Sequence, residues 1–339
     1  MTNTITAMPP FPWQHTFWQN FCDVRAKDRL PHALLLCGID GVGIELLAHS
    51  MARYLLCQSP LEDVACGRCR GCELYDAGTH PDLKVLGLED DAKKIKVDQV
   101  RSIVDFVGKT PHFSGYKVVV VEQADLMNSN SANAILKSLE EPAGQTIFIL
   151  ATTRTSAILP TIRSRCQKSS VSTPGTEAGL AWLREQNVDD AENWLQEAGG
   201  APVLAKTWAE GDYAVQRQSI VGSMAGFFDS AESVLTVASV WQKIPMDMLV
   251  SIQLAVLDAM IRAQSINTLQ DQQLSRCYEV FGRLNPTLLF KMRDKLLAKL
   301  AATHSGSNLN PLMLCEELAM DWHALATMAQ RVSRSKAVQ

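Results

Sequence analysis

The sequence predicts an α/β domain built on a parallel sheet, followed by a small helical segment and a larger all-α region. Over the first half of the chain, short apolar runs alternate with amphipathic helical segments, which is the pattern of a parallel sheet with helices on both faces. After about residue 168 the pattern changes to helices alone. Aromatic residues make up only 6% of the chain and helix formers dominate, so we expect helix to outweigh strand.

The predicted strands are continuous apolar runs of the kind that a parallel sheet buries on both faces. They comprise residues 33–37, 82–86, 118–121 and 146–151. Helices are predicted between and after them, the one at 131–141 being stopped by Pro142. These helices comprise 44–55, 97–107, 131–141, 177–186, 191–198 and 203–210. We therefore divide the chain into domains at 1–168, 169–210 and 211–339.

Composition and charge exclude some classes of protein. The chain has 339 residues with 32 Lys and Arg against 36 Asp and Glu, a net charge of −4, which argues against a general nucleic-acid coat protein. Residues 1–13 lack the basic flank and apolar run of a secretory signal, and no apolar stretch approaches the roughly 18 residues that a membrane helix requires. We expect a cytoplasmic location and no membrane partner.

Four cysteines form a ladder with the pattern C-x8-C-x2-C-x2-C. They are Cys57, Cys66, Cys69 and Cys72. Cys-x-x-Cys spacing lets two thiolates converge on one ion, and four sulfurs complete the tetrahedron that zinc prefers. A disulfide pair is disfavoured in a reducing compartment, while an iron–sulfur cluster and unrelated buried thiols remain as alternatives. We predict a structural zinc site at 57–72, closed to water and therefore not catalytic.

A glycine-rich loop lies between the first predicted strand and helix. A phosphate-binding loop reads glycine, four residues, glycine, lysine, then serine or threonine, and Gly38 and Gly43 match its two glycines. Ile44 stands at the lysine position and Glu45 at the hydroxyl position. Losing two contacts to charged groups should cost about 3–6 kcal/mol of nucleotide binding. By itself, a glycine-rich turn between strand and helix needs no nucleotide.

In an ATPase with a phosphate-binding loop, an Asp-Glu pair at the end of a neighbouring strand holds magnesium and orients the attacking water. The strand at 118–121 ends at the corresponding position. Here the pair is Glu122-Gln123, so an amide replaces the catalytic carboxylate, although Glu122 could still favour a cation. Both halves of the nucleotide machinery are degraded, and we expect no bound ATP.

These motifs together resemble the clamp-loader branch of the AAA+ ATPases. Residues 161–166 read Thr-Ile-Arg-Ser-Arg-Cys and resemble the Ser-Arg-Cys motif of that branch. Residues 131–142 look like the helix that it carries before its sensor strand, and the cysteine ladder is similar to the zinc module of its bacterial members. The resemblance covers about residues 30–205; the remainder matches only in length and helical character.

The resemblance implies an AAA+ module with a helical lid at 169–210 and a collar domain for oligomerisation at 211–339. It implies a hetero-pentamer with clamp-loader ATPase subunits and a delta-type subunit, which opens a sliding clamp and closes it around primed DNA. In such rings the Ser-Arg-Cys arginine, here Arg165, reaches the ATP of a neighbouring subunit, and Ser164 and Cys166 would position it. The lid's sensor arginine position holds Pro202, a third lost nucleotide contact.

Two other functions remain open. One is an active ATPase motor subunit of the same complex with an unusual loop. The other is a zinc-stabilised nucleic-acid-binding module without a ring, which would use the basic residues of 93–96 and 163–168. Runs of charge are usually solvated faces, and without the family match we would interpret the turn at 163–168 in that way.

Overall fold

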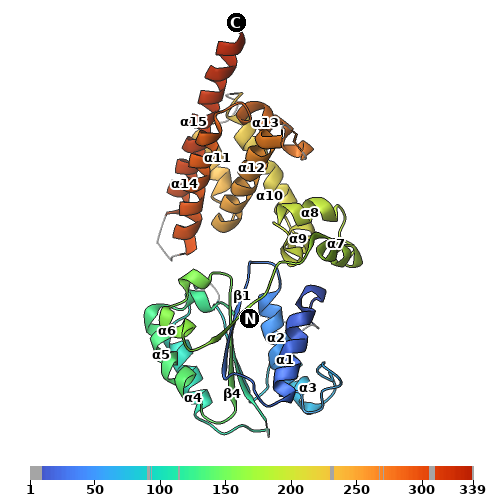
Figure 1. Ribbon diagram of the computed structural model, residues 1–339. Helices are drawn as coiled ribbons and strands as arrows, with labels where there is room; N and C mark the ends of the chain where they lie inside the picture. The colour runs from blue at the N-terminus through green and yellow to red at the C-terminus, as the bar shows by residue number, and fades with distance from the viewer. Residues whose placement is uncertain are drawn as a thin grey trace. The chain divides into compact units, whose positions relative to one another are not determined.

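A computed structural model of the chain describes residues 10–89, 92, 94–113, 115–229, 233–266, 268–269, 271–304 and 310–337. The chain divides into two compact units, Met1–Thr207 and Trp208–Gln339, each of which is described by itself (Figure 1). Lys93, part of the basic stretch named above, lies outside the described residues.

The first unit contains a five-stranded sheet in the order β2-β3-β4-β1-β5, in which every pairing is parallel. Its strands are β1 (Ala33–Cys37), β2 (Leu83–Leu86), β3 (Lys117–Val121), β4 (Thr146–Thr152) and β5 (Gln167–Ser170). The three inner strands are buried along their whole length, which explains why their sequences are continuous apolar runs.

Helices cover both faces of this sheet (Figure 1). On one face lie α4 (Val97–Val107), α5 (Ser129–Glu140) and α6 (Pro160–Arg163), which share a hydrophobic core with the strands. On the other lies α2 (Ile44–Leu56), accompanied by α1 (His15–Ala26) and α3 (Arg70–Asp76). Short 3-10 turns at Pro12–Gln14, Ala124–Leu126 and Thr155–Ala157 connect these elements.

Three helices follow the sheet: α7 (Thr176–Glu185), α8 (Ala191–Glu197) and α9 (Pro202–Glu210). The second unit is helical throughout its described residues. Its helices are α10 (Tyr213–Gly226), α11 (Val234–Trp241), α12 (Met246–Ile266), α13 (Ser275–Phe281), α14 (Pro286–His304) and α15 (Pro311–Ala337), with a 3-10 turn at Gln272–Leu274. Trp322 lies at its centre, fully buried, with its ring against Phe281 and its indole N–H donating to Gln253 at 2.9 Å.

The predicted fold class is confirmed: a parallel sheet with helices on both faces, a cysteine cluster inserted after α2, and a remainder that is mostly helical. The fifth strand, β5, crosses the position at which the first predicted domain ends, because it runs from residue 167 to residue 170. The division into three domains at 168 and 210 stays a prediction.

No single helix among the described residues has the length and apolar composition needed to span a membrane; only α11 and α12 taken together pass that test, and they are bent by 120°.

Candidate nucleotide loop, cysteine cluster and arginine turn

The glycine loop joins the carboxyl end of β1 to the first turn of α2. Gly41 and Gly43 both have left-handed backbone angles, with φ of 76° and 79°, a conformation that favours glycine. A Cβ atom on Gly43 would lie 2.3 Å from the ring of Phe11. Glycine is therefore required here for close packing against the chain's own N-terminal segment.

That segment forms a plug over the loop. The Trp13 indole N–H donates to the Val42 carbonyl at 3.0 Å, and the Gln14 amide donates to the same carbonyl at 2.9 Å and to the Gly43 carbonyl at 3.1 Å. The rings of Phe11 and Trp13 are stacked with centroids 4.8 Å apart. We call Phe11, Trp13 and Gln14 the N-terminal plug.

The three helices after the sheet also close over the loop. The Trp182 ring of α7 meets both aromatic rings of the plug edge-on, with centroids 5.4 and 5.5 Å apart. The backbone N–H of Val203, beside Pro202 in the first turn of α9, donates to the Gly41 carbonyl at 3.0 Å. A Cβ atom on Gly41 would lie 2.3 Å from Leu204. The loop thus has side chains or backbone of the same chain on several sides.

The residues at the degenerate positions are themselves engaged. Ile44 is 4% exposed, and its side chain would clash with a Cβ atom on Gly38 at 2.8 Å. The Gln123 amide donates to the Glu45 carboxylate at 2.9 Å. Burial raises the pKa of Glu45 above its usual value, and the nearby carboxylate of Glu122 raises it further, against the opposing effect of the Gln123 hydrogen bond.

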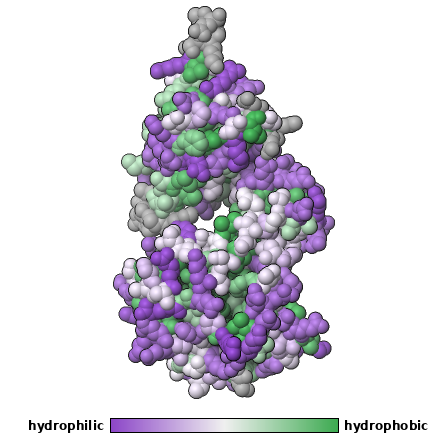
Figure 2. Space-filling view, viewed as in Figure 1, coloured by the Kyte–Doolittle hydropathy of each residue, from purple (hydrophilic) through white to green (hydrophobic). Residues whose placement is uncertain are grey.

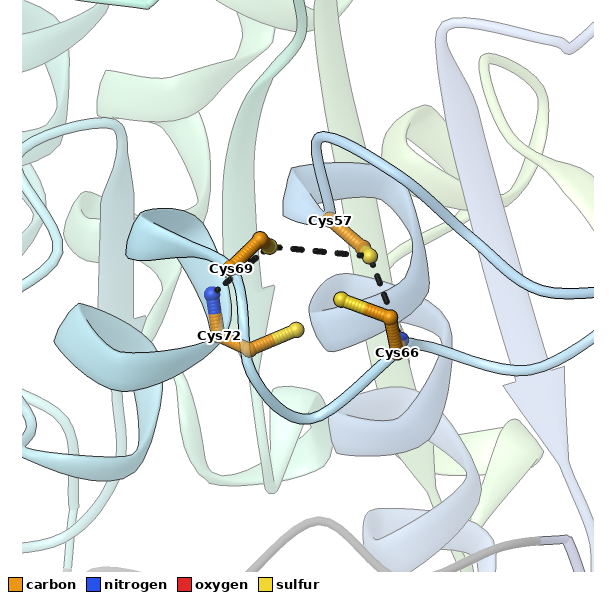
Figure 3. A group of neighbouring side chains, drawn as sticks. All are labelled: Cys57, Cys66, Cys69 and Cys72. Carbon is orange, nitrogen blue, oxygen red and sulfur yellow. Dashed lines mark hydrogen bonds between the residues drawn. The ribbon is translucent and has the colours of Figure 1, made fainter.

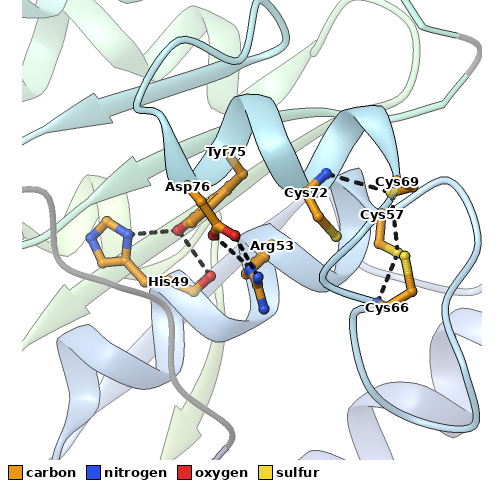
Figure 4. A network of polar contacts seen from close by, with 8 residues as sticks. All are labelled: His49, Arg53, Cys57, Cys66, Cys69, Cys72, Tyr75 and Asp76. Atoms are coloured by element: carbon orange, nitrogen blue, oxygen red, sulfur yellow. Dashed lines mark hydrogen bonds and ion pairs between the residues drawn. The ribbon is translucent and has the colours of Figure 1, made fainter.

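Glu122 is held by a histidine. His49 Nε2 lies 2.8 Å from a Glu122 carboxylate oxygen. On its other side, His49 Nδ1 lies 2.8 Å from the Tyr75 hydroxyl of α3 (Figure 4). Tyr75 in turn donates to the His49 carbonyl at 3.0 Å. Beside this chain of contacts, Arg53 of α2 pairs with Asp76 of α3 through two hydrogen bonds of 2.9 and 2.7 Å. These contacts fix α3 against α2.

The four cysteines of the ladder converge in space (Figure 3). Their Sγ atoms all lie within 4.8 Å of one another, and those of Cys57 and Cys69 are 3.8 Å apart. Four thiolates at the 2.3 Å Zn–S distance on a tetrahedron would be about 3.8 Å apart. Gly67, with φ of 71°, turns the chain between the second and third cysteine. The donor set therefore fits a tetrahedral ion that prefers sulfur.

Hydrogen bonds to the sulfurs tune this cluster. The Ser59 hydroxyl and backbone N–H groups lower the pKa of Cys66 to about 6. Burial raises the pKa of Cys69, but backbone N–H groups of Cys72 and Gln58 outweigh it and the pKa is lowered. Burial raises the pKa of Cys57 and Cys72. Metal binding requires thiolates. The surroundings of Cys66 and Cys69 therefore favour the thiolate form that a metal ion would bind.

The Ser-Arg-Cys turn lies between α6 and β5. Arg165 donates from Nε to the Glu140 carboxylate at 2.6 Å, forms an ion pair with the same carboxylate through Nη2, and donates from Nη1 to the Thr161 carbonyl at 2.9 Å. Ser164 Oγ lies 3.4 Å from Nη1. Cys166 is 8% exposed in the core, where burial, and then the nearby Cys37 thiol, raise its pKa to about 11.

The arginine turn and the glycine loop lie at opposite ends of the sheet. Arg165 precedes the first residue of β5, whereas the loop follows the last residue of β1, and these two strands are paired in parallel with Leu34 opposite Gln167. The four steps from residue 33 to residue 37 span about 13 Å. Arg165 is therefore remote from the glycine loop of its own chain.

The predicted site residues form three separate groups in the structure. One is the cysteine cluster, the second is the degenerate loop with the strand-end residues, and the third is the Ser-Arg-Cys turn. Sequence reasoning missed the partners that occupy them, for which the sequence carries no local signal because each partner is remote in the chain. They are Trp13, Gln14, His49, Tyr75, Trp182 and Glu140. In the basic stretch at 93–96, Lys96 forms an ion pair with Glu89 at 2.9 Å, and Ile95, which lies between the lysines, is buried.

Comparison with known proteins assigns the chain to a family. A family profile described as DNA polymerase III, delta subunit, matches residues 13–174. The DNA polymerase III subunit delta′ of Pseudomonas aeruginosa is 35% identical over 323 residues, covering 93% of this chain and 98% of the relative. The subunit delta′ of Escherichia coli is 34% identical over 218 residues, covering 63% of this chain and 65% of the relative.

Among solved structures, a gamma subunit-related protein of DNA polymerase III from Thermotoga maritima aligns with 94% of this chain and 99% of its own, at 18% identity and a TM-score of 0.46. The identity and the near-complete coverage of the Pseudomonas relative decide the assignment. The chain belongs to the family of bacterial DNA polymerase III delta′ subunits.

Proposed function

We propose that this chain is a non-hydrolysing subunit of the DNA polymerase III clamp loader that donates Arg165 to the ATP site of a neighbouring subunit. The observation that carries the proposal is the contrast between a nucleotide loop filled by the chain's own residues and an arginine that stays partly exposed. Arg165 has 32% of its side chain exposed, at the far end of the sheet from that loop.

The filled loop supports the absence of ATPase activity in this chain. A phosphate-binding loop acts through backbone N–H groups, a lysine and a magnesium ion. Here the lysine is replaced by a buried Ile44, and Trp13 and Gln14 take the Val42 carbonyl within the loop. Glu122 is engaged by His49 and not left free for a metal ion. The active-motor alternative would require ATP to displace several of these contacts together.

The position of Arg165 supports action in trans. An arginine that is remote from its own loop can reach a nucleotide only on another chain. A fixed guanidinium stabilises charge on a transferring phosphoryl group, and an arginine finger can be worth about 10³–10⁵ in rate. Ser164 contacts the guanidinium, while Cys166 anchors the turn by packing in the core.

The cysteine cluster supports a structural zinc ion held by Cys57, Cys66, Cys69 and Cys72. When bound, the ion would supply a covalent brace between the end of α2 and the start of α3, since Cys57 follows the one and Cys72 lies in the other. Two contacts already join the same two helices across this junction, one between Arg53 and Asp76 and the other between His49 and Tyr75. The site offers no reaction step of its own.

The partners follow from the family. We propose a hetero-pentamer with clamp-loader ATPase subunits and a delta-type subunit, which contacts the sliding clamp and primed DNA as a complex within the polymerase holoenzyme. The second unit supports a role in assembly, because large apolar side chains of α14 and α15 are exposed: Phe290 by 48%, Met313 by 70% and Met320 by 53%. Apolar patches are visible on this unit in Figure 2. Such patches mark interaction surfaces.

Two measurements test the proposal. The isolated chain should show no ATP binding in the micromolar range; tight binding with turnover would refute the non-hydrolysing role. In the reconstituted complex, Arg165→Ala should lower the clamp- and DNA-stimulated ATPase, by up to about 10³-fold at the site it serves.

Arg163→Ala is the matched control, because Arg163 is an exposed arginine two residues before Arg165, at the end of α6. It should leave turnover unchanged. Equal effects of the two substitutions would mean that the turn contributes only positive charge, and no effect of Arg165→Ala would refute the arginine finger.

A further inference from the structure

We propose that Glu140 is a positioning residue that holds the Arg165 guanidinium ready for a nucleoside triphosphate on a neighbouring subunit. The inference rests on the proposed role of Arg165 in trans and adds to it the residue that orients the arginine. Glu140 is the last residue of α5, and its carboxylate is the one acidic group among the contacts described for Arg165.

The contacts restrain the guanidinium on two sides. Glu140 accepts from Nε at 2.6 Å and also pairs with Nη2, while Nη1 donates to the Thr161 carbonyl at 2.9 Å and lies 3.4 Å from Ser164 Oγ. A guanidinium has five N–H donors, and these contacts use one on Nε, one on Nη2 and two on Nη1. One Nη2 donor is left over, which suits contact with a phosphate oxygen.

The pair is open to an incoming ligand. Arg165 has 32% and Glu140 has 46% of the side chain exposed. Both line a shallow depression together with His32, Leu139 and Ser164. The arginine is thus oriented by its own chain and still reachable from outside, which is the arrangement that a residue acting on another subunit requires.

Stability alone does not explain this ion pair. Exposed ion pairs contribute little to folding. In addition, the negative end of the helix dipole disfavours a carboxylate in the last turn of a helix. A carboxylate at residue 140 is therefore unfavourable for α5 by itself. Its evident physical effect is to restrict the many rotamers of a long arginine side chain, and groups held in place beforehand act more effectively in a transition state.

The test uses the reconstituted clamp loader with clamp and primed DNA, in four forms: wild type, Glu140→Ala, Arg165→Ala and the double variant. Glu140→Ala should lower the Arg165-dependent part of the ATPase kcat on the order of tenfold, with the KM for ATP little changed. In the Arg165→Ala background the same substitution should have no further effect. Glu140→Gln, which keeps an oxygen acceptor, should lose less than Glu140→Ala.

Glu141→Ala is the matched control, because Glu141 is the adjacent exposed carboxylate and is not among the residues in contact with the Arg165 guanidinium in the described chain. It should leave kcat unchanged. Unchanged or faster turnover with Glu140→Ala, while Arg165→Ala is slow, would overturn the positioning role alone. Loss with Glu140→Ala that persists in the Arg165→Ala background would also overturn it. No effect of Arg165→Ala would instead refute the proposed function beneath it.

Discussion

The two ends of the sheet differ in what their polar groups contact. At the carboxyl end, the glycine loop and the neighbouring strand end are engaged by the plug, α9 and a histidine of the same chain. At the amino end, Arg165 is oriented by Glu140 and Thr161 but keeps a third of its side chain exposed. The two groups lie at opposite ends of the strands, so residues that fill the loop at one end leave the contacts of Arg165 at the other end unchanged.

The largest expected effect comes from breaking the cysteine cluster, which braces only the α2 and α3 side of the sheet. Cys66→Ser should abolish binding of about one zinc per chain and lower the free energy of unfolding by several kcal/mol, because structural zinc binds with about 10–16 kcal/mol. Metal analysis and thermal unfolding measure both effects. Cys277→Ala, a buried cysteine of α13, should keep the zinc. Full zinc content in Cys66→Ser would disprove the site.

Removing the ring of Trp13 from the plug tests how much the contacts over the glycine loop contribute to the stability of the folded chain. Trp13→Ala deletes a half-buried ring, its stacking on Phe11, its edge contact with Trp182 and a hydrogen bond to Val42. We expect a loss of about 2–3 kcal/mol in urea unfolding, since a fully buried tryptophan costs more. Trp13→Phe keeps a ring and loses the N–H, so it should cost about 1 kcal/mol. A stable Trp13→Ala protein would mean that the plug adds little to folding.

The smallest expected effect is the pH dependence conferred by Glu45. Its pKa is raised in the folded state by burial, so the folded protein holds this proton more tightly than the unfolded chain. The contribution of Glu45 to stability is thus fully present below the unfolded value near 4.5 and is lost as pH rises through the raised value. Glu45→Gln should raise the melting temperature slightly at pH 7 and not at pH 4. Equal shifts at both pH values would contradict this linkage.

The sheet and its covering helices were largely predictable because burial leaves a direct mark on sequence. The strand at 33–37 and the helix at 97–107 agree with the structure at both ends. The prediction missed β5, whose sequence Gln-Lys-Ser-Ser is mostly exposed and has no apolar run. It also missed α1, which packs through a few aromatic residues such as Trp18 and Phe21 instead of a continuous apolar face.

The residues of the candidate site likewise fall into those that the sequence predicted and those that it did not. The cysteine ladder and the degenerate loop were readable because their residues are close together in the sequence. Glu140 and His49 were not, because Glu140 is 25 residues from Arg165 and His49 is 73 residues from Glu122. Only the parallel sheet, which places distant strand ends and helix ends side by side, brings these pairs together. Motif spacing carries no information about such contacts.

The edge strand β5 affects how readily the chain aggregates through the edge of its sheet before it is assembled with its partners. A sheet edge presents unpaired backbone groups to which strands of other molecules can add, and a subunit that awaits its partners carries that hazard in solution. In β5 only four residues are exposed to it, one of them Lys168, and its other side is already paired with β1. A short, charged, polar border of this kind protects the chain against edge-to-edge aggregation.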